Sequence, residues 1–142
     1  MKCVTDTRKS ALADILKGKV TIVGIGNVLK GDDGLGPILS ERLKTVLDIP
    51  CINVGSAPEN YIGKIAGESP DTVLFIDATH LDRPPGTFEI LNSNELRHMG
   101  FSTHDISPGF YIEMLESQIP GRIFLLGIQP EQTTLGTGLS PT

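Results

Sequence analysis

The chain has 142 residues, with a formal net charge of -5 and an isoelectric point near 5.1. That length is enough for one domain with a sizeable core, which we expect to span residues 1–142. The acidic balance argues against nucleic acid or an anionic membrane as the main partner. Neither a secretory signal nor a membrane-spanning stretch is visible, so we expect a soluble cytoplasmic protein. The two cysteines form no zinc or disulfide pattern.

Apolar and polar residues alternate between strand-like and helix-like patterns along the chain. Runs rich in valine and isoleucine predict buried strands, and leucines three or four residues apart predict amphipathic helices. The expected elements are a helix over 6–17, a strand over 19–25, a helix over 37–47, a strand over 51–54, a helix to about residue 66, strands over 72–76 and 86–91, a helix over 107–117 and a strand over 122–128. Their sum is an open α/β sheet with helices on both faces.

Local signals support several of these boundaries. Pro37 suits the first turn of its helix, where Leu39, Leu43 and Leu47 share one face. The segment 56–59 has the pattern of a capping box that starts the next helix. The segment 86–91 follows two prolines, which predicts an edge strand that can run antiparallel.

The most informative segment runs from Gly24 to Pro37 and follows the first strand. It opens like a dinucleotide-binding loop, but Leu29 stands where such a loop needs its third glycine. The adjacent acids Asp32 and Asp33 come next, and a phosphate cradle does not favour two carboxylates at its rim. A site for a metal ion or an activated water does favour them.

The other candidate side chains also follow predicted strands or precede predicted helices. Asp77 comes directly after the apolar run over 72–76, at the end of that strand, and His104 lies in the loop before the helix over 107–117. In open α/β sheets, ligands bind beyond the carboxyl ends of the strands. Two carboxylates and an imidazole at that edge can hold a borderline divalent metal or activate a water.

Each candidate also has an ordinary structural interpretation. Asp32 or Asp33 can cap the helix that follows, and Asp77 can cap the turn after its strand. His104 alone fits a solvent-facing loop histidine, and His80 is a reserve candidate three residues after Asp77. The sequence does not show whether the candidates converge.

Several segments, taken in order, resemble motifs of the hydrogenase maturation endopeptidases. These segments are Gly24 to Asn27 with Gly31 to Pro37, Val54 to Asn60, Phe75 to Ala78, Pro85 to Thr87, Ser102 to His104, Leu126 to Pro130 and Gly138 to Thr142. The resemblance covers the chain from about residue 20 to its end. Relatives generally continue past Thr142 into a C-terminal helix, which we expect to be missing from this chain.

The resemblance implies a three-layer α/β/α fold, with a twisted, mostly parallel five-stranded sheet between two layers of helices. It places catalytic and metal-binding roles on Asp33, Asp77 and His104, in a peptidase that the family classification calls aspartic-type. The implied substrate is the precursor of a nickel–iron hydrogenase large subunit, which loses its C-terminal extension after nickel insertion. The nickel, supplied by the precursor, acts as the recognition element, and other divalent metals can occupy the same site. A monomer is favoured.

Two other functions stay open at this point. A nickel-binding maturation chaperone would use the same three ligands without cleaving its partner. A nucleotide-binding Rossmann-like domain is disfavoured by Leu29 and by Asn53, since no acid closes the second strand.

Overall fold

The computed structural model describes residues 13–99 and 108–131, and it places eleven helices and strands within them. These elements are β1 (Val20–Ile25), η1 (Gly31–Gly34), α2 (Leu35–Val46), β2 (Cys51–Gly55), η2 (Pro58–Tyr61), α3 (Ile62–Gly67), β3 (Thr72–Ala78), β4 (Phe88–Asn92), α4 (Ser93–Met99), α5 (Pro108–Gln118) and β5 (Arg122–Ile128). The two elements labelled η are short 3-10 helices.

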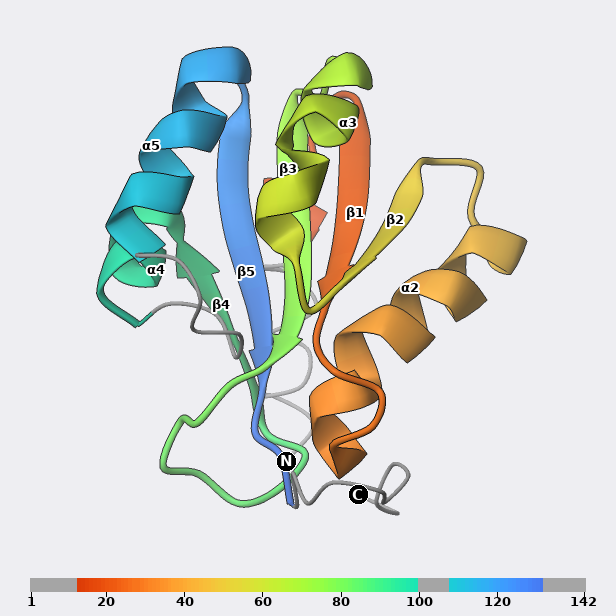
Figure 1. Ribbon diagram of the computed structural model, residues 1–142, viewed down its shortest axis with the longest axis vertical. Coiled ribbons are helices and arrows are strands. Elements are labelled where there is room, and N and C mark those ends of the chain that lie inside the picture. Colours follow the sequence, from red (N-terminus) through yellow and green to blue (C-terminus); the bar gives the residue numbers. More distant parts are fainter. Residues whose placement is uncertain (1–12, 100–107, 132–142) are drawn as a thin grey trace.

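The five strands form one sheet in the order β2-β1-β3-β5-β4 (Figure 1). β1 pairs in parallel with β2 and β3, and β3 pairs in parallel with β5. β4 runs antiparallel to β5 at the edge, as its prolines and alternating pattern predicted. β3 is buried along its whole length, which confirms the central strand expected from its continuous apolar run.

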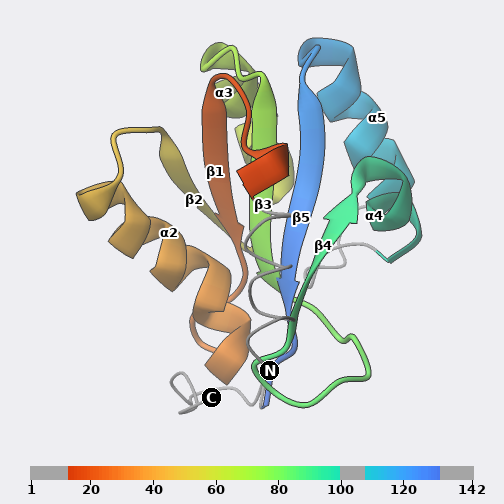
Figure 2. The ribbon, with the colours of Figure 1, turned by 180° about the vertical axis from the view of Figure 1, so that it is seen from behind.

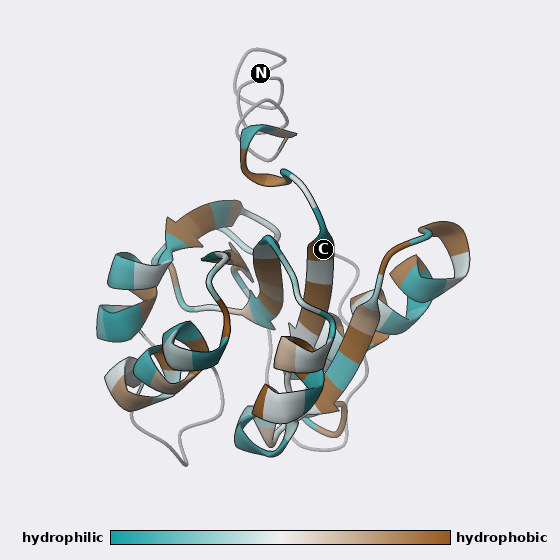
Figure 3. Ribbon diagram, turned by 90° about the horizontal axis from the view of Figure 1, so that it is seen from above, coloured by the Kyte–Doolittle hydropathy of each residue, from teal (hydrophilic) through white to brown (hydrophobic). Residues whose placement is uncertain are grey.

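Helices cover both faces of this sheet, so the expected three-layer α/β/α fold is confirmed. One face packs against α3, α4 and α5 through a large apolar cluster that includes Phe75, Leu96 and Tyr111. The other face packs against α2, where Leu39 and Leu43 cover a smaller cluster (Figures 1 and 2). Seen from above, α2 lies apart from α3 and α5, and many residues of the strands between the layers are hydrophobic (Figure 3). No helix within the described ranges is long and apolar enough to cross a membrane.

Two sequence-based expectations differ from the structure in detail, and one helix was not expected. α2 ends at Val46, so Leu47 follows the helix and is 40% exposed instead of lying on its buried face. The prediction of a capping box over 56–59 was wrong, because the N-cap of η2 is Ala57 and no side chain makes a capping hydrogen bond there.

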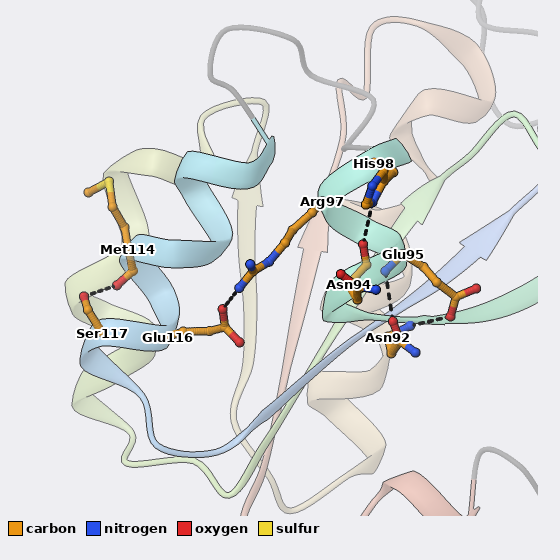
Figure 4. Close-up of polar contacts among 8 residues, drawn as sticks. All are labelled: Asn92, Asn94, Glu95, Arg97, His98, Met114, Glu116 and Ser117. Carbon is orange, nitrogen blue, oxygen red and sulfur yellow. Dashed lines mark hydrogen bonds and ion pairs between the residues drawn. The ribbon is translucent and has the colours of Figure 1, made fainter.

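The third difference is α4, which the sequence analysis did not predict. The capping pair lies here: Asn92 N–H donates to Oε1 of Glu95, and Glu95 N–H donates to Oδ1 of Asn92 (Figure 4). Two of the expected helices lie partly outside the described residues: the helix over 6–17, of which 13–15 are helical, and the first residue of the helix over 107–117.

Candidate active site

Four parallel strands end at one edge of the sheet, and two of the three expected site residues lie there. Asp33 belongs to η1, which follows β1, and Asp77 is the penultimate residue of β3. β1 and β3 are paired neighbours, and η1 packs against β3. The structure therefore brings the elements that carry Asp33 and Asp77 together at the carboxyl edge, as the strand order requires.

Close backbone approach fixes where η1 and α2 sit. A β-carbon on Gly36 would lie 2.2 Å from the carbonyl oxygen of Ile25 and 2.3 Å from that of Ile76. A β-carbon on Gly26 would lie 1.8 Å from the carbonyl oxygen of Asp33. Only glycine permits these approaches, so the glycines of this segment allow the first turn of α2 to rest directly on the ends of β1 and β3.

The Asp33 carboxylate closes the loop that precedes it. Its Oδ2 accepts a hydrogen bond of 3.0 Å from the main-chain N–H of Asn27, and the residue is only 8% exposed. The N-cap of α2 is Gly34, without a side-chain cap, so the interpretation of Asp32 or Asp33 as caps of that helix was wrong. Within the described residues Oδ1 of Asp33 accepts no hydrogen bond.

Asp77 is completely buried at the end of the central strand. Alternation along β3 places its side chain on the same sheet face as Val73 and Phe75, the face covered by α3 and α5. A buried carboxylate loses its hydration, so it must be compensated by hydrogen bonds, by a partner charge or by a metal. A site at this edge gives a reason to keep an acid in an otherwise apolar strand.

The three histidines contribute little to the described part of this edge. His104 lies outside the described residues, so its convergence with Asp33 and Asp77 stays a prediction. His80 is exposed in the loop after β3. His98 contacts the carbonyl oxygen of Asn94 on its own helix through Nδ1 (Figure 4). Over residues 13–99 and 108–131, no three histidine, cysteine or acidic side chains are grouped to hold a metal.

Two residues that shape this edge had no role in the sequence analysis. Asn27 positions the loop with its backbone, and its Oδ1 also accepts the N–H of Leu29. Gln129, directly after β5, accepts the N–H of Leu81 with its side chain and exchanges backbone hydrogen bonds with Gly86 and Thr87. Their only sequence signal is their place in two of the family motifs, Gly24 to Asn27 and Leu126 to Pro130.

The family model described as hydrogenase maturation protease matches residues 37–142. The chain belongs to the hydrogenase maturation protease family. The match includes Asp77 and His104 and begins four residues after Asp33. Membership confirms the resemblance on which the sequence analysis relied, and it identifies the chain as a protease.

Named relatives and solved structures agree with this assignment. The hydrogenase 3 maturation protease of Escherichia coli is 36% identical over 110 residues, which are 75% of this chain and 70% of the relative. The crystal structure of the NiFe hydrogenase maturation protease HycI from Thermococcus kodakarensis matches with a TM-score of 0.83 at 35% identity, covering 92% of this chain and 87% of that one. The solution structure of the endopeptidase HycI from Escherichia coli matches with a TM-score of 0.72 at 28% identity, and the match covers 87% of this chain and 80% of that one.

Proposed function

We propose that this maturation protease removes the C-terminal extension from the precursor of a nickel–iron hydrogenase large subunit, after nickel has been inserted. Family membership supports the reaction class. The observation that supports the assignment of residues is the contact between η1, which carries Asp33, and β3, which carries Asp77. Cleavage by a site built on these carboxylates makes the enzyme an aspartic-type protease.

The donor set suits an ion that arrives with the substrate. Asp33 and Asp77, with His104 as the proposed third ligand, supply two carboxylates and one imidazole but no thiolate. Such a set suits borderline divalent ions and leaves coordination positions open. Three ligands on separate segments bind more weakly than a closed structural site, so nickel carried by the precursor completes the arrangement. Recognition of that nickel makes cleavage a check on correct loading.

This proposal predicts that cleavage follows the metal content of the precursor. The experiment incubates the protease with metal-free, nickel-loaded and zinc-loaded large-subunit precursor, and reads the C-terminus by mass spectrometry. We expect shortening of the nickel-loaded precursor alone. Equal shortening of the metal-free precursor would contradict the recognition step, and an unchanged length in all three samples would favour a nickel chaperone over a protease.

A further inference from the structure

The neighbouring acids Asp32 and Asp33 hold different parts of the chain. Asp33 bonds back to Asn27, six residues before it. Oδ2 of Asp32 instead accepts a hydrogen bond of 2.8 Å from the main-chain N–H of Glu131, 99 residues away. Asp32 is buried at 7% exposure whereas Glu131 is exposed, so this contact is partly buried. A hydrogen bond to a charged acceptor is stronger than one between neutral groups.

The segment that receives this contact is also tied to the loop after Asp77. Glu131 follows Gln129 by two residues, and Gln129 N–H donates to the carbonyl oxygen of Thr87 at 2.7 Å. Gly86 N–H donates to the carbonyl oxygen of Gln129 at 3.0 Å. Residues 129–131 therefore connect the loop after β3 with the segment after β1. Gln129 makes the contacts to the first of these, and the hydrogen bond between Glu131 and Asp32 makes the contact to the second.

We propose that Asp32 is a positioning residue. By accepting the N–H of Glu131 it fixes η1 to the segment after β5, and so holds Asp33 in its position relative to Asp77. Asp32 and Asp33 are adjacent on a single 3-10 turn, so a displacement of Asp32 moves Asp33 with it. Displacing a reacting group by about 1 Å can reduce a rate by about 100-fold. Asp32 acts through an acceptor oxygen, and its charge takes no part in the reaction. The activity readout rests on the proposed function, whereas the contact itself does not.

Amide hydrogen exchange at Glu131 tests the contact without any substrate. We expect a protected amide in the wild type and in Asp32→Asn, whose amide oxygen still accepts the bond. In Asp32→Ala the same amide should exchange at least about tenfold faster, since its acceptor is gone. Equal protection in the wild type and Asp32→Ala would overturn the proposal.

Processing of nickel-loaded precursor tests the positioning role. Asp32→Ala and Glu131→Pro each remove one half of the bond, and we expect each to slow processing by about tenfold or more. The matched controls Asp32→Asn and Glu131→Gln keep acceptor and donor, and should retain rates within about twofold of the wild type. Circular dichroism at the assay temperature shows whether each variant is folded. The double variant Asp32→Ala/Glu131→Pro should process the precursor no more slowly than the slower of the two single variants, because both remove the same hydrogen bond.

The outcomes separate this proposal from the proposed function. Rapid processing by folded Asp32→Ala would overturn the positioning role. Loss of activity in Asp32→Asn with a protected Glu131 amide would overturn it too, because the charge of Asp32 would then take part in the reaction. If the wild-type protein leaves the precursor intact, the proposed function fails and the exchange experiment decides the contact by itself.

Discussion

The main-chain N–H of Asn27 donates to Oδ2 of Asp33, so this carboxylate holds the loop that precedes it. A neutral amide oxygen can accept the same N–H, and therefore the loop contact does not require the charge of Asp33. A metal ligand or a general base does require it. This difference allows the structural and chemical roles of Asp33 to be separated by a single substitution.

We expect Asp33→Asn to lower the processing rate of nickel-loaded precursor by about 100-fold or more, because the charge is lost while the acceptor stays. The melting temperature should stay within a few degrees of the wild type, since the loop keeps its hydrogen bond. Mass spectrometry of the precursor and a thermal melt measure the two quantities.

Asp71→Asn is the matched control for that substitution. Oδ2 of Asp71 also accepts a main-chain N–H, from Lys19 at 2.8 Å, but it does so at the opposite edge of the sheet, just before β3. We expect wild-type processing from this variant. Near-wild-type processing by Asp33→Asn would instead assign Asp33 a purely structural role.

Replacing Gly36 by alanine should be costly. The new β-carbon would meet the carbonyl oxygens of Ile25 and Ile76 at distances that real side chains do not adopt. Backbone at the ends of β1 and β3 cannot move cheaply, so we expect a loss of about 2 kcal/mol or more in the free energy of unfolding. Urea denaturation followed by circular dichroism measures it.

Gly63→Ala in α3 is the matched control for Gly36→Ala. A β-carbon at Gly63 meets nothing within 4 Å, and alanine favours the helix by up to about 1 kcal/mol. We expect an unchanged or slightly higher stability. Equal stability of Gly36→Ala and the wild type would mean that the first turn of α2 does not rest on the strand ends.

Stability should decline above pH 10 in a way that depends on Tyr111. Burial, and then the negative charge of Glu59, raise the pKa of Tyr111 well above its ordinary value of 10. The unfolded chain therefore loses this proton at a lower pH than the folded chain. The contribution of the Tyr111 hydroxyl to the free energy of unfolding is complete below pH 10 and is lost as the pH rises further. Tyr111→Phe should lower stability at pH 8 by about 1 kcal/mol, because the hydroxyl no longer donates to the carbonyl oxygen of Pro58.

Urea denaturation at pH 8 and pH 11 checks that expectation. The free energy of unfolding should fall more between these two values in the wild type than in Tyr111→Phe. The same fall in both proteins would show that Tyr111 does not account for the alkaline loss.

Removal of metal from the enzyme should leave its activity intact. If nickel enters with the precursor, protease that has been treated with a chelator and then desalted should shorten nickel-loaded precursor as fast as untreated protease. The C-terminus is again read by mass spectrometry. Activity that returns only when metal is added back to the protease would make the ion a resident cofactor.

The sequence predicted the sheet well because buried parallel strands have a simple signature. β1, β3 and β5 are continuous apolar runs, and Asp77 is conspicuous as an acid at the end of one of them. The edge strand β4 was equally clear from its alternation and its prolines. Strand order then places Asp33 and Asp77 at one edge without further information.

The remaining features depend on contacts that no local pattern contains. Asp32 accepts the main-chain N–H of Glu131, far away in the chain, whereas Asp33 accepts that of Asn27 nearby. The true capping pair at Asn92 and Glu95 opens a short, mostly polar helix that is anchored by the buried Leu96, so the periodicity of α4 is weak. The segment 56–59 has the residue types of a capping box, but Pro58 starts a 3-10 helix there instead.

The place of β5 in the sheet has a consequence for biosynthesis. β5 is the last of the five described strands to be made, yet it lies between β3 and β4, so β4 lacks its partner in the described sheet until β5 has emerged from the ribosome. Pairing between distant segments is slow, and incomplete sheets expose edges that aggregate. Oδ2 of Asp32 can accept the main-chain N–H of Glu131 only when Glu131 has been added. A nascent chain that stops before that residue therefore lacks both the hydrogen bond that joins η1 to the segment after β5 and the full pairing of β4.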